Sequence, residues 1–465
     1  MRGQLLRLRR LHSALSAAQL VRPSTGVHAA AALTTTELRD HGRASWRRPT
    51  LLLGGLGIGL SLLAAAHASP TQCEAPAALD SRYATDDDDA TTGLSVPLDG
   101  ERFAAIDVPS RATRFSCATY KANFPIEDRY DVQTFPDGDV FALVLDGHGG
   151  WQVSEYGRKS LIENVRKEVQ HLQPKSKATP QNNPQDADGA AETPELSRHH
   201  IASAIQRGFT RTDRDLMAKV SEAFQLGFGA VGRCGSCALM VYVRGTTLHV
   251  ANAGDIRAVL GRKPASSSSW IGGGSSASAS QPLIAVPLSQ DQNAMAKSEQ
   301  ERLRREHPGE DNVVVCRRPD SCYVKGALQP TRALGDFALK YSEFNGPPYV
   351  QGDRSAGRHI AAPYSPPYIT AVPEVRTHEL HDDDQFVIIG SDGVWDFLSN
   401  DEAVQVVREQ LEKGTPELAG RALVERTLRR AAERYGISYL DLLSLPAGSH
   451  RRRRHDDTTV VVVFF

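Results

Sequence analysis

The sequence predicts an α+β or sheet-on-sheet layered domain, because helical and strand patterns stand in separate blocks without a simple βαβ alternation. Two runs of β-branched and apolar residues, VFALVLDG at 140–147 and FVIIGSDG at 386–393, both end in Asp-Gly. Such runs are typical of buried strands. A third run, 458–465, follows the acidic pair Asp456-Asp457. We therefore expect three strand ends that carry aspartates to meet at one edge of a sheet.

The individual elements follow from apolar periodicity and from turn residues. We expect helices at 151–172, 197–221, 294–306, 400–414 and 416–435, with Asn400 as the N-cap of the fourth. We expect strands at 140–145, 237–243, 247–251, 256–261, 386–390 and 459–465. The Arg244-Gly245 step predicts a hairpin turn between the second and third strands.

The first hundred residues differ in composition from the rest. Residues 1–49 are rich in arginine, serine and alanine and contain only two acids, which is typical of a mitochondrial or plastid transit peptide; a disordered basic tail is the alternative. Within a segment at 50–70, the apolar run 51–68 is just long enough to cross a bilayer, as a membrane helix or as a sorting segment that is later removed. We assign 71–100 to a polar linker and 101–465 to the catalytic domain, with flexible insertions near 173–195 and 266–281.

Charge and cysteine content exclude other classes. The formal net charge of −1 gives no reason to expect nucleic-acid binding. The six cysteines are too few and too scattered for a disulfide scaffold. The CGSC segment at 234–237 lacks the second well-spaced pair that a structural zinc requires, because Cys316 and Cys322 do not have that spacing, so we expect free thiols.

Aspartates at the ends of buried strands indicate a metal site. Clustered carboxylates repel one another and raise each other's pKa values unless cations neutralise them. Hard oxygen ligands favour Mg²⁺ or Mn²⁺ over zinc. The pattern therefore predicts a metal-dependent hydrolase.

Particular residues have distinct expected roles. Asp146 is expected to bridge metals, with the Gly147 carbonyl as a further oxygen ligand. His148 has the ordinary pKa to protonate a departing alkoxide. In the adjacent pair Glu127-Asp128 the side chains point to opposite faces, so only one can be a direct ligand of a given metal.

Three further aspartates are candidates for the same site. Asp392, in GSDGVWDFL, completes the metal set. Asp255 follows a strand and would hold an additional, weaker metal or be an ordinary turn residue. Asp336, in QPTRALGDF, lies either near the site or in a purely structural position.

Taken in order, PIED, LDGHGG, ANAGDIRAVL, TRALGD, GSDGVWDFL and DDTTVVVV resemble the motifs of the metal-dependent protein phosphatases, also called type 2C Ser/Thr phosphatases. The resemblance spans roughly 115–465, apart from the two insertions. ANFPIEDRY and LSQDQNAMAKSEQERLRREHP look more narrowly like the mitochondrial pyruvate dehydrogenase phosphatase branch.

The resemblance implies a four-layer α-β-β-α fold, with a central antiparallel β-sandwich flanked by helices and two Mg²⁺ or Mn²⁺ ions at one end. Its implied metal ligands are Glu127, Asp146, the Gly147 carbonyl, Asp392 and Asp456, with Asp255 for a third ion. Asp128 would orient a metal-bound water, and His148 would be the general acid. Two such ions can activate a bridging water for in-line attack on a phosphoryl group.

The chain departs from the family pattern at several positions. Asn123 stands where many members have a phosphate-binding arginine, and either Arg114 or Arg129 is a candidate to supply the missing charge. Gln292 replaces a family histidine. The arginine run at 451–454 would dock an acidic partner or form a solvated loop, and we favour the loop.

These observations predict a mitochondrial, metal-dependent phosphoserine/phosphothreonine protein phosphatase, located in the matrix or at the inner membrane and intermembrane space. Its partner would be a phosphorylated protein, by resemblance the pyruvate dehydrogenase complex, with membrane contact through 51–68. The alternatives are a pseudophosphatase that binds phosphoproteins without hydrolysing them and a membrane-tethered scaffold.

Overall fold

The computed structural model describes residues 96–172, 194–264, 282–346 and 359–465. The expected transit segment (1–49), the apolar segment (50–70), the linker up to residue 95 and nearly all of both insertions lie outside the described residues. Within the described part of the chain, no helix combines the length and the apolarity that crossing a membrane requires. The folded unit described below lies within 88–465.

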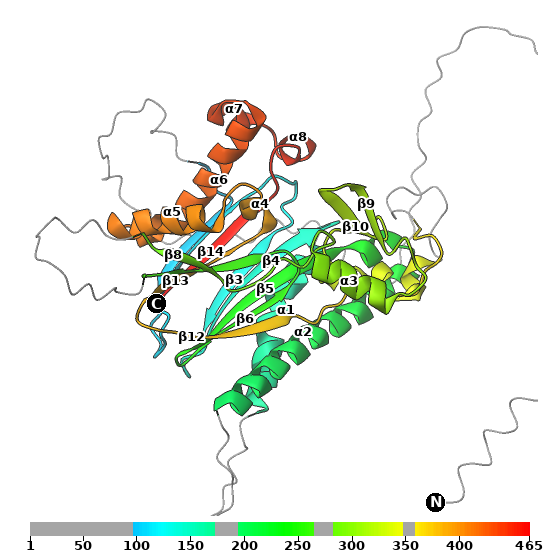
Figure 1. Cartoon of the computed structure of the whole chain (residues 1–465), viewed down its shortest axis with the longest axis horizontal. Helices are drawn as coiled ribbons and strands as arrows, with labels where there is room; N and C mark the ends of the chain where they lie inside the picture. Colours follow the sequence, from blue (N-terminus) through cyan, green and yellow to red (C-terminus); the bar gives the residue numbers. More distant parts are fainter. Residues whose placement is uncertain (1–95, 173–193, 265–281, 347–358) are drawn as a thin grey trace, which may run out of the picture. The chain divides into compact units, whose positions relative to one another are not determined.

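Two antiparallel sheets form the centre of the fold (Figure 1). The first sheet has the strand order β1-β2-β14-β13-β7-β8, and the second has the order β12-β6-β5-β4-β3, with β11 pairing with β5. The first comprises β1 (Gly100–Ala105), β2 (Arg114–Tyr120), β14 (Thr458–Phe464), β13 (Asp384–Gly390), β7 (Arg257–Arg262) and β8 (Ile284–Pro287). The second comprises β12 (Glu374–Glu379), β6 (Thr247–Ala253), β5 (Gly235–Arg244), β4 (Val140–His148), β3 (Arg129–Thr134) and β11 (Leu334–Gly335).

Strand β5 shows why the central strands are continuous apolar runs. Cys237, Leu239 and Val241 face the core between the two sheets. The alternate residues Met240 and Tyr242 face the core on the other side of the same sheet. Because successive side chains of a strand point to opposite faces, a strand that is covered on both faces is apolar at every position.

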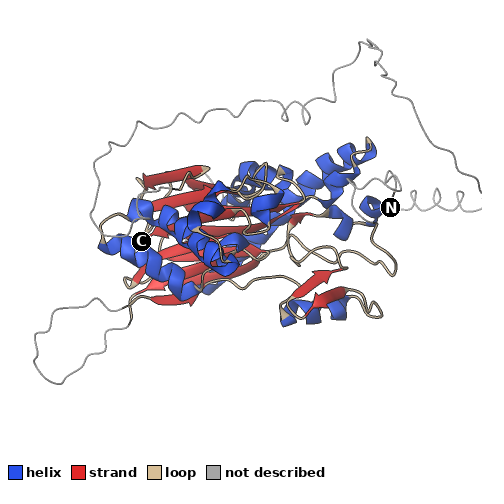
Figure 2. Ribbon diagram, turned by 90° about the horizontal axis from the view of Figure 1, so that it is seen from above, coloured by secondary structure: helices blue, strands red, loops and turns tan. Residues whose placement is uncertain are grey.

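Helices cover the outer face of each sheet, as Figures 1 and 2 show. One apolar core joins the second sheet to α1 (Gln152–Gln170) and α2 (Pro194–Gln225). Another joins the first sheet to α5 (Asn400–Glu412) and α6 (Ala419–Tyr435). The predicted four-layer α-β-β-α arrangement is therefore confirmed.

The remaining elements are short. The described residues also contain α3 (Lys297–Glu306), α4 (Asp392–Trp395), α7 (Tyr439–Ser444) and α8 (Ser449–Arg452), the 3₁₀ turns η2 (Gly229–Arg233), η3 (Phe337–Leu339), η4 (Ser342–Asn345) and η6 (Pro416–Leu418), and a hairpin of β9 (Val314–Arg318) and β10 (Ser321–Val324). Val96 is buried in the core beneath α5 and α6, so the folded unit includes the last residues of the segment that the sequence assigns to the linker.

Two local predictions about helix starts need correction. Ser399, not Asn400, is the N-cap of α5, because the Ser399 hydroxyl accepts from the Glu402 N–H and the Glu402 side chain accepts from the Ser399 N–H. Helix α3 begins at Lys297 rather than at 294. The hairpin at Arg244-Gly245 is confirmed, since Arg244 pairs directly with Thr247 across the turn.

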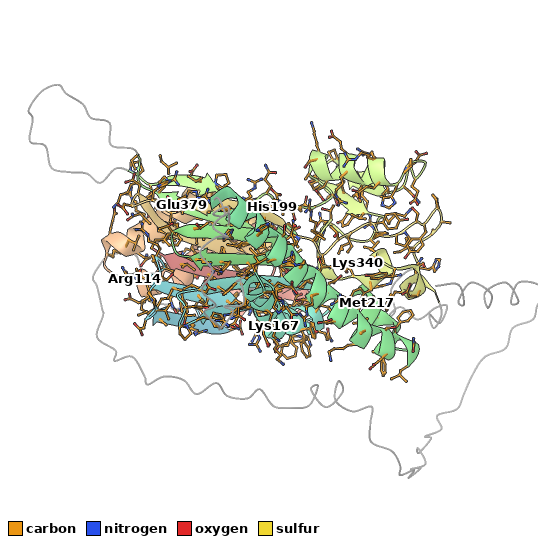
Figure 3. All side chains as sticks on the ribbon, turned by 90° about the horizontal axis from the view of Figure 1, so that it is seen from below. Arg114, Lys167, His199, Met217, Lys340 and Glu379 are labelled. Carbon is orange, nitrogen blue, oxygen red and sulfur yellow. A yellow bond between two sulfur atoms is a disulfide. The ribbon has the colours of Figure 1, made fainter. Side chains whose placement is uncertain are left out.

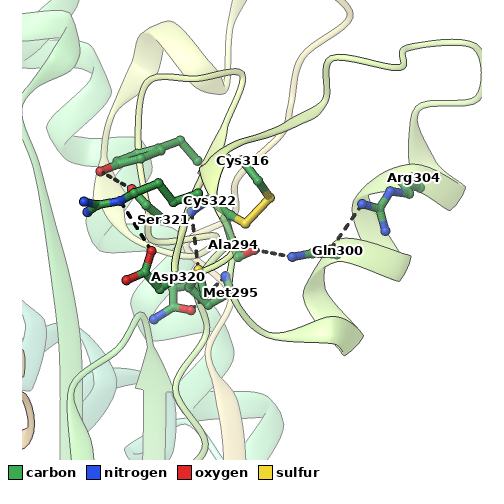
Figure 4. Close-up of a disulfide and its surroundings, with 11 residues drawn as sticks. Ala294, Met295, Gln300, Arg304, Cys316, Asp320, Ser321 and Cys322 are labelled. Atoms are coloured by element: carbon green, nitrogen blue, oxygen red, sulfur yellow. Dashed lines mark hydrogen bonds and ion pairs between the residues drawn. A yellow bond between two sulfur atoms is a disulfide. The ribbon is translucent and has the colours of Figure 1, made fainter.

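The prediction of free thiols is wrong for one pair of cysteines. Cys316 and Cys322 form a disulfide (Figure 4). The cause is the β9–β10 hairpin, whose antiparallel register places Cys316 opposite Cys322 with their Cα atoms 3.9 Å apart. The Cys322 N–H also donates to the sulfur of Met295 at 3.3 Å. Cys117, Cys234 and Cys237 are free and buried.

Candidate active site

The ends of three central strands bring three aspartates together. Asp146 lies near the end of β4, Asp392 begins α4 two residues after β13 ends, and Asp456 lies two residues before β14. The N–H of Asp392 donates to Oδ2 of Asp146 at 3.4 Å. Two hydrogen bonds join β13 and β14 at this end. The Ser391 N–H donates to the Thr459 carbonyl, and the Thr459 N–H donates to the Ser391 hydroxyl, both at 3.0 Å.

Burial and neighbouring carboxylates dominate the electrostatics of this cluster. Burial and the neighbouring charge of Asp392 raise the pKa of Asp146 well above its ordinary value. Burial and Asp456 do the same to the pKa of Asp392. Burial raises the pKa of Asp456 to about 6, although the Arg452 guanidinium beside it acts in the opposite direction. Burial therefore disfavours the charged form of all three carboxylates, and neighbouring carboxylates add to this effect.

A second acidic segment faces the cluster and is held there by Asp457. Oδ1 of Asp457 accepts from the N–H groups of Ala122 (2.6 Å) and Asn123 (2.8 Å), and Oδ2 accepts from the Glu127 N–H at 2.8 Å. Burial and the charge of Asp457 raise the pKa values of both Glu127 and Asp128. The structure thus brings the predicted Glu127-Asp128 pair to Asp456. Sequence reasoning did not recognise Asp457 as the residue that holds it.

The donor set fits a hard divalent cation. Oδ2 of Asp128 and Oδ1 of Asp392 are buried without a hydrogen-bond partner. An added Cβ at Gly147 would lie 2.4 Å from the Glu127 carbonyl, so a larger residue at this position would separate the two acidic segments. Among the described residues, no three carboxylate, histidine or cysteine side chains stand in a ready-made ligand arrangement. A cation would give the unpartnered oxygens a ligand to bind and would stabilise the charged form of carboxyls whose pKa values are raised.

His148 is paired with a residue far away in the sequence. Its Nε2 lies 2.7 Å from Oδ2 of Asp336. Burial opposes the charge on the imidazole, but the Asp336 carboxylate outweighs it, and the pKa of His148 is raised. Asp336 itself has a left-handed backbone (φ 52°) and is 4 % exposed. Of the two readings that the sequence left open for Asp336, its place beside His148 is the one the geometry favours.

Asp255 lies on the side of the cluster next to β5. Its Oδ1 accepts from the Cys237 thiol at 3.1 Å, and its Oδ2 accepts from the Asn293 amide at 3.4 Å. Burial raises its pKa. In the strand register, Cys237 lies directly opposite Asp146. The hydrogen bond between Cys237 and Asp255 therefore places Asp255 beside the cluster.

The arginine run at 451–454 is only partly the solvated loop that the sequence favoured, since Arg452 and Arg453 are exposed but Arg451 is not. Arg451 is buried, and its guanidinium donates to the carbonyls of Lys121 (2.9 Å) and Leu445. Arg452 forms an ion pair with Asp456. The reason is that α8 packs against the acidic segment, with the Gly448 N–H donating to the Ala122 carbonyl at 2.7 Å.

Comparisons with known proteins agree with this geometry. Residues 135–435 match the family model described as protein phosphatase 2C. A protein of Arabidopsis thaliana described as probable protein phosphatase 2C 38 is 32% identical over 349 residues, which are 73% of this chain and 77% of that protein. Probable protein phosphatase 2C 34 of Oryza sativa subsp. japonica is 31% identical over 343 residues, 74% of this chain and 77% of that one.

The fold has a counterpart among solved structures. The crystal structure of serine-threonine phosphatase 2C from Toxoplasma gondii superimposes with a TM-score of 0.50 and 17% sequence identity, covering 79% of this chain and 99% of that chain. The family match includes Asp146, His148 and Asp392, whereas Glu127 and Asp456 lie beyond its ends. This chain belongs to the protein phosphatase 2C family of serine/threonine phosphatases.

Proposed function

We propose that this protein hydrolyses phosphoserine and phosphothreonine in proteins with two Mg²⁺ or Mn²⁺ ions, and a third where Asp255 contributes. The single observation that carries the proposal is the convergence of Asp146, Asp392 and Asp456 on one end of the sandwich, where the pKa of each carboxyl is raised. Glu127 and the Gly147 carbonyl complete the proposed ligand set. When bound, the cations would supply a water of lowered pKa and would stabilise charge on the phosphoryl oxygens.

The chain's own residues supply orientation and a proton. Asp128, whose Oδ2 is buried without a partner, accepts a hydrogen bond from the attacking water and orients it. Asp336 holds the His148 ring through Nε2. Nδ1, on the other side of the ring, donates its proton to the departing serine or threonine oxygen as the P–O bond breaks. The products are inorganic phosphate and the free hydroxyl side chain.

Purified chain and a phosphothreonine peptide test this function directly. We expect phosphate release with Mn²⁺ or Mg²⁺, none with EDTA, and losses of at least 100-fold in Asp146→Asn and Asp392→Asn, because each removes a charge that holds a cation. Asp382→Asn is the matched control, since Asp382 is almost fully exposed and pairs with Arg111. Turnover that survives EDTA, or that survives in both site variants, would refute the proposal.

We also propose a mitochondrial location. Its support is the arginine-rich, acid-poor composition of residues 1–49. Residues 51–68 are proposed to contact a membrane, either as an anchor or as a sorting segment. Imaging and protease protection of a C-terminal fusion, with and without 1–49, would test the location. A fusion found outside mitochondria would contradict the location, and import that does not depend on 1–49 would contradict the role of that segment.

The phosphorylated pyruvate dehydrogenase complex is the substrate that we propose, on the resemblance of ANFPIEDRY and of the 288–308 segment to that phosphatase branch. The test compares kcat/KM on the phosphorylated complex with kcat/KM on an unrelated phosphothreonine peptide. We expect a preference of at least tenfold for the complex. Equal values would leave the phosphatase activity intact and remove this substrate.

A further inference from the structure

Asn123 offers no positive charge to the phosphoryl group of a substrate. Arginine suits this task, because its fork of N–H groups binds two phosphoryl oxygens at once. Asn123 is uncharged and is already bonded, since its Nδ2 donates to Oδ1 of Asp456 at 3.2 Å and to Oδ2 of Asp457 at 3.1 Å. Asn123 therefore holds the side chains of Asp456 and Asp457 in place by hydrogen bonds.

Neither arginine that the sequence suggested is suitably placed. Arg129 bonds through Nε to Glu155 at 2.8 Å and through Nη1 to the carbonyls of Ile126 and Asp128. Arg114 begins β2 and pairs with Phe464, whereas the other end of the same strand pair, Tyr120 with Thr458, adjoins Asp456. Figure 3 shows Arg114 at one end of the sheets and Lys340, four residues from Asp336, toward the other.

Arg452 is at the acidic cluster. Its guanidinium forms an ion pair with Asp456 while its side chain remains 51% exposed. Although burial lowers its pKa, the charges of Asp456, Asp392 and Asp146 outweigh this effect and raise it. The guanidinium is therefore within the field of three proposed metal ligands and still open to solvent, from which a phosphoprotein would approach.

Contacts of the preceding residue hold the backbone that carries Arg452 against the end of β2. The preceding residue, Arg451, lies over the ring of Tyr120 with its Cζ 4.9 Å from the ring centroid, and it donates to the Lys121 carbonyl. Arg454 is directed elsewhere, over the ring of Tyr435 at 5.0 Å, and Arg453 is exposed. The four arginines thus differ in role, and Arg452 is the one directed at the carboxylates.

We propose that Arg452 binds the phosphoryl group of the substrate, in place of the arginine that Asn123 replaces. This proposal rests on the phosphatase function above. Asp456 and the phosphoryl group are alternative partners of the same guanidinium. With a cation as the partner of Asp456, the Nη2 group that now pairs with Asp456 would be free for phosphoryl oxygens. Arg452 takes no part in proton transfer. Its role is to hold the substrate, and the product phosphate, by two charge-assisted hydrogen bonds.

The test uses the whole chain with Mn²⁺ and compares Arg452→Ala, Arg452→Lys and the matched control Arg453→Ala. Inorganic phosphate is the probe, and its Kd is measured by calorimetry together with the Kd for Mn²⁺. We expect Arg452→Ala to weaken phosphate binding by about tenfold or more and to raise KM by a similar factor with a smaller change in kcat. Arg452→Lys should lie between, because an ammonium cannot form the fork. Arg453→Ala should match the wild type.

The outcomes separate this proposal from the function on which it rests. An unchanged phosphate Kd in Arg452→Ala, accompanied by tighter Mn²⁺ binding, would mean that Arg452 only neutralises Asp456, and the proposal would be overturned. A wild type without turnover would refute the phosphatase function, while the phosphate Kd would still report on Arg452. If circular dichroism shows that Arg452→Ala does not fold, the decision rests on Arg452→Lys. A phosphate Kd in Arg452→Lys equal to that of the wild type overturns the proposal, and a higher phosphate Kd supports it.

Discussion

The Nε2 atom of His148 and the Oδ2 atom of Asp336 are 2.7 Å apart, although 188 positions separate the two residues in the chain. The Asp336 carboxylate raises the pKa of His148 against the opposing effect of burial. In the proposed reaction the imidazole donates a proton, so it must be protonated before each turnover. Asp336 thereby extends the pH range of the enzyme upward.

The first prediction concerns the pH profile. Asp336→Asn removes the charge that raises the pKa of His148, so the protonated form is lost at a lower pH. We expect the alkaline limb of the kcat profile to move to lower pH, with a lower maximum rate. Phosphate release from pH 5.5 to 9.5 at saturating Mn²⁺ would measure it. An alkaline limb at the same pH as in the wild type would exclude Asp336 from this role.

A second prediction concerns the glycine that leaves room for this pair. An added Cβ at Gly235 would lie 1.9 Å from Oδ2 of Asp336 and 2.4 Å from Nε2 of His148. Gly235→Ala must therefore push the two side chains apart, and we expect kcat to fall by roughly 100-fold, the lower end of what general acid catalysis contributes. Gly346→Ala is the control, since open space surrounds Gly346. Equal kcat values in the two variants would contradict the prediction.

The fold class and the acidic strand ends could be predicted from the sequence for a physical reason. Central strands such as β4 and β14 are buried on both faces, and they appear as unbroken apolar runs. The strand β1 is largely exposed and polar, so its sequence GERFAA carries no comparable signal and was not predicted. The hairpin β9–β10 was missed too, and with it the pairing of Cys316 and Cys322.

The parts of the site that sequence reasoning missed depend on long-range packing. Asp457 belongs to the recognisable DDTT motif, but its hydrogen bonds to the 122–127 segment cross 330 to 335 positions. Arg452 looked like one of four equivalent arginines, because the run contains no signal that distinguishes them. Only the packing of α8 against the Ala122 carbonyl separates their roles.

A third prediction concerns the stability of the metal-free protein. Burial raises the pKa of Asp456 to about 6 in the folded state, above its ordinary value of 3.8. Between these two values the folded chain binds more protons than the unfolded chain, so the free energy of unfolding falls as pH rises through this window. The metal-free protein should therefore melt at a higher temperature near pH 5.5 than near pH 7.5.

Calorimetry in EDTA would measure this difference. Mg²⁺ should raise the melting temperature more at pH 7.5 than at pH 5.5, because at pH 7.5 the carboxyls have lost the protons that neutralise them at pH 5.5 and the cation takes over this role. Asp456→Asn removes one titrating group, and its melting temperature should depend less on pH. A melting temperature that rises steadily from pH 5.5 to 7.5 in EDTA would show that the cluster is not under repulsion.

The last prediction concerns Asp457, whose two oxygens accept from three backbone N–H groups in the 122–127 segment. Asp457→Asn keeps the size of the side chain but replaces one acceptor by an NH₂ donor, so it leaves either the Glu127 N–H or the Ala122 and Asn123 N–H groups without their partner. An unpaired buried donor costs about 1–3 kcal/mol. We therefore expect a free energy of unfolding lowered by that amount. Since Glu127 would also lose its fixed position, we expect Mn²⁺ binding weakened by about tenfold or more. Denaturant titration and calorimetry would measure both, with the exposed Asp382→Asn as the control; wild-type Mn²⁺ affinity in Asp457→Asn would show that Glu127 is positioned by other contacts.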